Sequence, residues 1–179
     1  MQQTPAPTAN VPGYEPWLHV VLHEPEIAYN TGSVGRTCVA LGAKLWLVRP
    51  LGFTIDDRQL RRAGLDYWAH LAWEAVEDWA ALCERLPVER AWCFTKFADR
   101  SYADAEFRRG DVLVFGSESR GLPDSIHAAA AGRRLRIPTR PEVRSLNLSN
   151  SVAIAGYEAL RQAGGPAAIA GLAESFPES

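Results

Sequence analysis

Three polar segments interrupt an otherwise apolar pattern, and each carries residue types that can bind or activate a ligand. They are NTGSVGRTC (30–38), GSESRGLP (116–123) and IPTRPEVRSLNLSNS (137–151). Each follows a short apolar run that is typical of a buried strand. In open parallel sheets, ligands bind beyond the carboxyl ends of the strands, where the loops gather. These three segments are therefore the candidates for a functional site.

The second segment places small and charged residues directly after a predicted strand. Gly116 and Gly121 would let the backbone approach a ligand that larger side chains exclude, and Glu118 with the free backbone amides could bind the polar edges of that ligand. An ordinary strand-to-helix loop that needs glycine for its turns accounts for the same residues. From this segment alone, both alternatives stay open.

The first segment contains an arginine that should lie outside the core. Arg36 is two residues away from both Val34 and Cys38, which are apolar positions of a predicted helix, so its side chain projects away from the core. It is expected to be exposed to solvent or to contact another molecule. For an isolated arginine, a solvated side chain is the simpler interpretation.

The elements that position these segments alternate between strands and helices. Short apolar runs predict strands at 18–22, 44–48, 67–71, 90–95, 111–116 and 134–138. Helical spacing predicts helices at 56–62, 74–86, 123–131 and 147–163, and a first helix that has Asn30 as its N-cap and ends at Gly42. This pattern indicates an α/β fold, with a mostly parallel sheet sandwiched by helices.

Length and composition predict one compact domain. The chain has 179 residues and is 47% apolar, and we place the domain at 17–163, between flexible tails at 1–16 and 164–179. The first residues lack the basic cluster and apolar core of a signal peptide, and no apolar run approaches the roughly 20 residues that span a bilayer. We therefore expect a cytoplasmic protein that makes no membrane contact.

Charge and metal-ligand spacing narrow the possible partners. A net charge of −2 argues against nucleic-acid binding through bulk positive charge, so any RNA contact must be local. The cysteines and histidines show no metal-ligand spacing, so no metal site is predicted. Local arginine clusters, which suit phosphate contacts but are more often solvated, are Arg58, Arg61 and Arg62; Arg133, Arg134 and Arg136; and Arg140 and Arg144.

The predicted last helix is apolar on two sides. One stripe holds Leu148, Val152, Ala155 and Ala159, and the other side holds Ile154, Tyr157 and Leu160. A helix of this kind needs two partners. The sheet can be one partner and the same helix of a second copy the other, which predicts a twofold homodimer. The alternative is a helix buried deep within one monomer.

Taken in order, the three polar segments resemble the three motifs of the SPOUT superfamily of S-adenosylmethionine-dependent RNA methyltransferases. EPEIAYNTGSVGRTC, GSESRGLP and IPTRPEVRSLNLSNSVAIAGYEALRQ are similar to the motifs of the branch that methylates ribose 2'-hydroxyls. LGFTIDDRQLRRAGLDYW further resembles the small tRNA wobble-position 2'-O-methyltransferases, and the likeness runs over about 18–162. The chain departs from many relatives at Ser33, where they carry Asn, and at Ala28-Tyr29, where they carry Pro-Pro.

The resemblance implies a fold, an assembly and a cofactor. The C-terminal part of the sheet is expected to form a deep trefoil knot, and the protein is expected to act as a homodimer with its site at the subunit interface. The resemblance places S-adenosylmethionine against Phe94, Thr95, Gly116, Glu118, Gly121, Ile137, Ser145 and Leu146.

The resemblance also implies roles in catalysis. It assigns the activation of the ribose hydroxyl to Arg36, with Asn30 and Ser145 shaping the pocket. Guanidinium groups normally keep their proton in proteins. Arg36 therefore either acts as a base in a special setting, or orients the hydroxyl and a neighbouring phosphate while the proton leaves by another route.

The implied activity is 2'-O-methylation of the wobble nucleotide, cytidine or uridine 34, with the dimer gripping the anticodon arm of tRNA. One alternative is a non-catalytic RNA-binding or nucleotide-binding module on the same scaffold, and another is the same chemistry on ribosomal RNA. The retained set of Asn30, Arg36 and Ser145 favours an enzyme over a pure binder. The lack of an appended RNA-binding domain counts against a ribosomal substrate.

Overall fold

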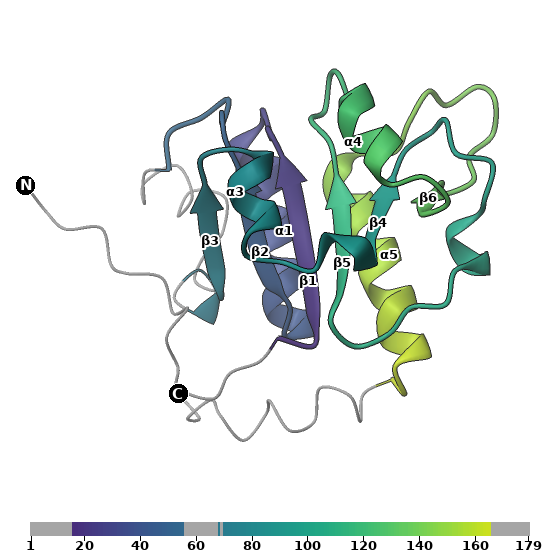
Figure 1. Cartoon of the computed structure of the whole chain (residues 1–179), viewed down its shortest axis with the longest axis horizontal. Helices are drawn as coiled ribbons and strands as arrows, with labels where there is room; N and C mark the ends of the chain where they lie inside the picture. Colours follow the sequence, from purple (N-terminus) through teal and green to yellow (C-terminus); the bar gives the residue numbers. More distant parts are fainter. Residues whose placement is uncertain (1–15, 56–67, 69, 166–179) are drawn as a thin grey trace, which may run out of the picture.

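The structure is a computed structural model that describes residues 16–55, 68 and 70–165. Its strands form one six-stranded sheet in the order β3-β2-β1-β5-β4-β6, in which every pairing is parallel (Figure 1). The predicted α/β fold with a mostly parallel sheet is confirmed. The strands are β1 (Leu18–His23), β2 (Lys44–Val48), β3 (Trp73–Val76), β4 (Ala91–Phe94), β5 (Asp111–Phe115) and β6 (Arg134–Leu135).

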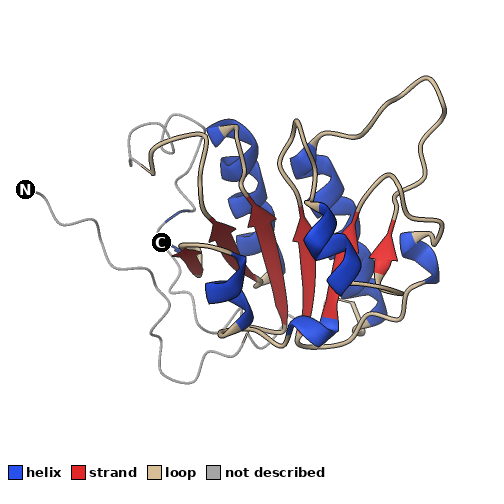
Figure 2. Cartoon of the chain, turned by 45° about the horizontal axis from the view of Figure 1, so that its top comes forward, coloured by secondary structure: helices blue, strands red, loops and turns tan. Residues whose placement is uncertain are grey.

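Helices cover both faces of this sheet. The two long ones, α1 (Ala28–Leu41) and α5 (Leu148–Gln162), pack side by side on one face. The short helices α3 (Trp79–Cys83) and α4 (Asp124–Ala129) lie on the other face, as Figure 2 shows. Two single-turn 3-10 helices, η2 (Val88–Arg90) and η3 (Tyr102–Asp104), complete the described elements. None of the helices in the described ranges has the length and apolar character needed to cross a membrane.

Each face of the sheet has its own hydrophobic core. Leu22 of β1 belongs to the cluster formed with α1 and α5, whereas its neighbour Val21 belongs to the cluster formed with α3 and α4. This double burial explains why the strands read as nearly continuous apolar runs. The helices α1 and α5 approach closely because Gly156 has no side chain: a Cβ there would lie 2.5 Å from Cδ1 of Leu41.

The last helix keeps one of its two predicted apolar sides inside the monomer. The stripe predicted to face the core is buried. On the other side Leu160 is buried and Ile154 half-buried, but Tyr157 is 53% exposed. The residues of the buried stripe are Leu148, Val152, Ala155 and Ala159.

The prediction that Asn30 caps the first helix was wrong. The helix begins two residues earlier, at Ala28, with Ile27 as its N-cap residue. Asn30 lies in the first turn, where its side chain bonds Glu118 at a distant part of the chain. A tertiary partner has therefore replaced the local capping bond that the residue type suggested.

The strand predicted at 67–71 was wrong, and the helix predicted at 74–86 is shorter than expected. Trp68 and Leu71 are not in a strand; their side chains pack against Gly35 of α1. The edge strand β3 comes later and includes Glu74, which pairs with Trp46, so the helix predicted from 74 begins only after β3. Apolar residues alone could not distinguish packing on a helix from pairing in the sheet.

The remaining differences between prediction and structure concern where elements begin and end. The strand predicted at 134–138 pairs with β4 only over Arg134–Leu135. The helix predicted at 56–62 and residue Tyr67 lie outside the described residues. The remaining predicted strands and helices agree with the structure to within a few residues at their ends.

A buried carboxylate fixes the start of β5, the strand that leads into the second polar segment. Asp111 is 2% exposed and accepts hydrogen bonds from Nε and Nη2 of Arg90 (3.0 and 2.7 Å) and from Nε1 of Trp92 (3.0 Å). It also accepts a bond from the backbone N–H of Arg108 at 2.8 Å. These bonds tie the beginning of β4 to the beginning of β5.

Replacing Asp111 by Ala should lower the free energy of unfolding by about 3 kcal/mol, because it leaves the buried Trp92 N–H without an acceptor and removes the partner of Arg90. Urea denaturation measures the change. The matched control is Glu106→Ala, which removes the exposed ion pair with Arg108 and should cost less than about 1 kcal/mol. Equal effects for the two variants would contradict the role given to Asp111.

Candidate functional site

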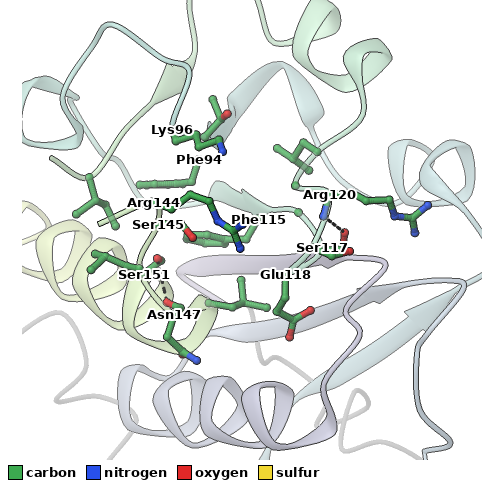
Figure 3. A pocket seen from close by; sticks show the side chains of 18 of the residues that line it. Phe94, Lys96, Phe115, Ser117, Glu118, Arg120, Arg144, Ser145, Asn147 and Ser151 are labelled. Atoms are coloured by element: carbon green, nitrogen blue, oxygen red, sulfur yellow. Dashed lines mark hydrogen bonds between the residues drawn. The ribbon is translucent and has the colours of Figure 1, made fainter. Parts of the chain in front are cut away.

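A cavity of about 420 Å³ opens at the carboxyl ends of β4 and β5. Its walls come from the residues after β4, the loop after β5 and the segment before α5, with Asn30 and Ile27 from the start of α1 (Figure 3). This volume is typical of sites that bind small ligands. The residues predicted for the cofactor all line it: Phe94, Thr95, Gly116, Glu118, Gly121, Ile137, Ser145 and Leu146.

The floor of the cavity is apolar and flat. Phe94 and Phe115 are register partners at the ends of β4 and β5. Their rings stack with centroids 4.6 Å apart and planes 13° from parallel. Because the sheet fixes both backbones, the floor does not depend on the loops around it. It offers a rigid surface for the apolar part of a ligand.

The loop after β5 folds back on itself. The N–H of Gly121 donates to the carbonyl of Ser117 at 2.9 Å, and Gly121 has a positive φ of 72°. A Cβ on Gly116 would collide with the backbone of Gly121 and Leu122. The two glycines are therefore required by the turn itself, as the ordinary-loop alternative proposed. That alternative does not account for the partly buried hydrogen bonds of Glu118.

Glu118 connects the loop after β5 to the start of α1. Its carboxylate accepts hydrogen bonds from the backbone N–H of Glu26 (2.8 Å) and from Nδ2 of Asn30 (2.9 Å). The side-chain oxygen of Asn30, Oδ1, in turn accepts a hydrogen bond from Nδ2 of Asn147 at 2.9 Å. All three polar segments of the sequence are therefore joined through the single side chain of Asn30.

A second set of hydrogen bonds joins the loop after β5 to the segment before α1, and here the loop after β5 is the donor. The carboxylate of Glu26 accepts hydrogen bonds from the backbone N–H and the hydroxyl of Ser119, at 3.0 and 2.5 Å. On the outer side, Arg120 forms an ion pair with Glu24 at 2.9 Å. The carboxylate of each loop thus accepts a backbone N–H of the other loop. These reciprocal bonds hold the wall of the cavity in one position.

Sequence reasoning missed several residues of the site. Asn147 was predicted only as a position near the start of the last helix, and it does cap α5 by accepting the N–H of Ser149 at 2.8 Å. Its second role, toward Asn30, has no local signal. His127 was treated as structural, yet it lines the cavity, and its buried Nδ1 has no hydrogen-bond partner among the described residues.

Arg36 is exposed, as predicted, but it does not line the cavity of its own chain. It lies six residues after Asn30 on α1, so its side chain leaves the helix about 120° away from that of Asn30. Tyr29, which is 67% exposed, lies seven residues before Arg36 and therefore on the same side of the helix. The predicted catalytic arginine and the predicted pocket are thus separate within one monomer.

Cys93 and His19 do not line the cavity. Burial raises the pKa of the Cys93 thiol to about 12, which makes it a poor nucleophile. Burial, and secondarily the charge of Lys44, lowers the pKa of His19 to about 4, and its Nδ1 accepts a bond from Trp46. No group of three or more metal-ligating side chains gathers anywhere in the described ranges.

Comparison with known proteins identifies the family. The model of the SpoU rRNA Methylase family matches residues 17–157. The chain belongs to the SpoU family. The predicted likeness to the SPOUT enzymes that methylate tRNA ribose is confirmed by the relatives described next.

Curated SpoU-family relatives are similar over most of their length. The chain is 45% identical over 144 residues to a tRNA (cytidine(34)-2'-O)-methyltransferase of Methylovorus glucosotrophus, covering 80% of this chain and 94% of the relative. It is 43% identical over 153 residues to the enzyme of that name from Escherichia coli strain K12, covering 85% and 98%.

Solved structures agree with the assignment of the chain to this family. One, reported as "Structural insights into the 2-OH methylation of C/U34 on tRNA", is 48% identical and has a TM-score of 0.77, covering 81% of this chain and 95% of that chain. The SpoU methyltransferase AviRb of Streptomyces viridochromogenes is 23% identical with a TM-score of 0.75, covering 87% and 62%, and supports the fold alone.

The bonds of Glu118 lead to a prediction about local stability in this SpoU-family site. Glu118→Ala should speed hydrogen exchange at the Glu26 amide about tenfold, because that N–H loses a charged acceptor. Exchange followed by NMR or mass spectrometry measures the effect. Arg120→Ala, which removes only the exposed pair with Glu24, should leave the Glu26 amide within about twofold of wild type. Unchanged exchange in Glu118→Ala would contradict the network.

Proposed function

We propose that this protein is an S-adenosylmethionine-dependent methyltransferase that methylates the ribose 2'-hydroxyl of nucleotide 34 in tRNA. The observation that carries the proposal is the joining of three distant segments around one cavity through Glu118, Asn30 and Asn147. The curated relatives at 45% and 43% identity are named for this reaction on cytidine 34 of tRNA, which favours tRNA over ribosomal RNA as the substrate. A tRNA substrate is consistent with a cytoplasmic enzyme.

The cavity fits S-adenosylmethionine in size and in chemistry. It combines the flat apolar floor of Phe94 and Phe115 with polar walls, and the buried Nδ1 of His127 is left without a partner among the described residues. We assign the cofactor to the residues that the sequence predicted for it, among which Ile137 and Leu146 would add apolar contacts. When bound there, the cofactor supplies an electrophilic methyl group on a sulfonium centre.

The residues of the chain contribute mainly by positioning. The transfer would break the bond between the sulfonium sulfur and the methyl carbon and form a bond between that carbon and the ribose oxygen. The neutral thioether would be the leaving group, and the proton of the 2'-hydroxyl would pass to solvent. Rigid walls hold the hydroxyl in line with the methyl carbon, which replaces a bimolecular encounter with an oriented one. Arg36 orients the hydroxyl and the neighbouring phosphate, because a guanidinium binds phosphate oxygens in a fixed fork geometry.

We further infer that Arg36 reaches the cavity of a second subunit in a homodimer. Tyr29 and Tyr157 are 67% and 53% exposed on the adjacent helices α1 and α5, and Arg36 shares the side of α1 that presents Tyr29. A second copy covering these aromatic side chains would bring its own Arg36 beside them. A twofold contact of this kind is reciprocal, so each subunit completes the other site.

The expected trefoil knot belongs to the same proposal. After β6, at the edge of the sheet beyond β4, the chain returns to pack α5 against α1. On the way it passes the loop after β5 and places Asn147 against Asn30. If this segment threads through a chain loop, the resulting knot would lock the walls of the cavity together.

Methylation of purified tRNA tests the proposal. The full-length protein is incubated with S-adenosylmethionine and total tRNA, with and without prior base modifications, and 2'-O-methyl nucleosides are mapped by mass spectrometry. A new methyl group on the ribose of nucleotide 34 is the expected result. Methylation only at other tRNA positions or only of ribosomal RNA would overturn the assignment, and so would an absence of methylation.

Gly116→Ala should weaken S-adenosylmethionine binding at least about tenfold, because the added methyl group collides with the backbone of Gly121 and displaces the loop. Isothermal titration calorimetry measures the affinity. The control is Gly132→Ala, at a φ of 83° with nothing within 4 Å of its Cβ, which should lower stability but leave affinity unchanged. Wild-type affinity in Gly116→Ala would show that the loop does not bind the cofactor.

Arg36→Ala should abolish methyl transfer and leave cofactor affinity nearly intact, because the side chain lies outside the cavity of its own chain. Single-turnover transfer to tRNA and calorimetry measure the two quantities. Arg85→Ala, which removes an exposed arginine that pairs with Glu74 away from the cavity, should behave as wild type in both assays. Transfer at the wild-type rate in Arg36→Ala would remove Arg36 from the mechanism.

A further inference from the structure

Phe97 is an exposed aromatic side chain at the rim of the cavity. At 71% exposure it is the most exposed large apolar side chain in the described part of the chain. It also lines the cavity, directly after Thr95 and Lys96. A phenyl ring in this position gives up the hydrophobic stabilisation that burial would provide. Single exposed apolar side chains are common, so it is the place of this ring at the cavity that makes it a candidate contact for a ligand.

The backbone holds Phe97 outward. The N–H of Phe97 donates to Oγ1 of Thr95 at 3.3 Å, and the following residue, Ala98, is buried and donates its N–H to the carbonyl of Thr95 at 3.4 Å. The turn is thus anchored on both sides of the ring. Phe97 is presented by an ordered turn that starts at the end of β4, one residue beyond the floor of the cavity.

Two basic side chains line the cavity together with this ring. The ammonium group of Lys96 lies 5.0 Å from the centroid of the Phe97 ring, and Arg144 lines the same cavity. Within the described ranges neither Lys96 nor Arg144 forms an ion pair, whereas Arg140, which does not line the cavity, pairs with Glu142. The rim therefore combines an accessible ring with positive charges that no carboxylate of the described chain neutralises.

An exposed aromatic ring in a cavity that also holds basic side chains free of ion pairs is a combination suited to single-stranded nucleic acid. Unstacked bases of RNA loops stack on aromatic side chains, while lysine and arginine contact the phosphates on either side. A protein partner would instead need a wider apolar patch, whereas the residue next to Phe97 is the basic Lys96 and the cavity also holds Arg144.

We propose that Phe97 is a stacking site for a base next to the methylated nucleotide, with Lys96 and Arg144 contacting the adjoining phosphates. The inference rests on the proposed function and deepens it by naming a substrate-positioning residue outside the three motifs. Stacking there would hold the anticodon loop open and present the ribose of the target nucleotide to the cavity. Because every base has an aromatic face, Phe97 would bind without selecting one sequence.

The test uses an anticodon stem-loop RNA with 2-aminopurine next to nucleotide 34. Binding to the wild-type protein should change the fluorescence of 2-aminopurine, and Phe97→Ala and Phe97→Leu should both raise the Kd for the RNA about tenfold or more. Phe97→Trp should stay within about twofold of wild type, since it keeps an aromatic face. The affinity for S-adenosylmethionine should be unchanged in all three variants.

A matched control is Val143→Ala, which removes another exposed apolar side chain that does not line the cavity, and which should bind RNA as wild type does. Wild-type RNA affinity in Phe97→Ala would overturn the inference. So would full retention in Phe97→Leu, or a loss confined to cofactor affinity. If the wild type binds the RNA through Phe97 but leaves nucleotide 34 unmethylated, the proposed function fails and the stacking site stands.

Discussion

The amide side chain of Asn30 is the constraint on which the site depends. It is 5% exposed, and both of its ends are satisfied by residues distant in the sequence: its N–H group by Glu118 and its carbonyl by Asn147. A buried amide that loses a partner costs free energy comparable to a full hydrogen bond. The start of α1, the loop after β5 and the start of α5 are therefore coupled, and none can move without breaking bonds of another.

The sheet supplies the rigid part of the same design. Its parallel strands deliver the ends of β4 and β5 to one edge, and burial on both faces fixes their register, which brings Phe94 and Phe115 together as a floor. The loops then add polar groups whose positions are set by bonds between carboxylates and backbone amides. The rigid floor and the coupled walls of the cavity suit a reaction in which the orientation of the reactants provides much of the rate.

The sequence predicted the sheet and the polar segments well, because these follow from local patterns. Apolar runs and their stops located most strands, and the residues expected at the cofactor do line one cavity. The predictions failed where a residue distant in the sequence determines the local structure. Asn30 bonds Glu118 instead of capping its helix, and Leu71 packs on α1 instead of joining the sheet. The bond between Asn147 and Asn30 spans residues that no local pattern relates.

In the proposed homodimer, one subunit holds the methyl donor and the other supplies Arg36. Mixed dimers test this arrangement: a subunit carrying Arg36→Ala is paired with one carrying Gly116→Ala. Methyl transfer to nucleotide 34 is measured at an S-adenosylmethionine concentration too low for the Gly116→Ala homodimer to bind the cofactor. Recovered activity is expected, because the intact cavity of the Arg36→Ala subunit meets the intact Arg36 of the Gly116→Ala subunit. Mixed dimers that form but stay as inactive as either parent would contradict it.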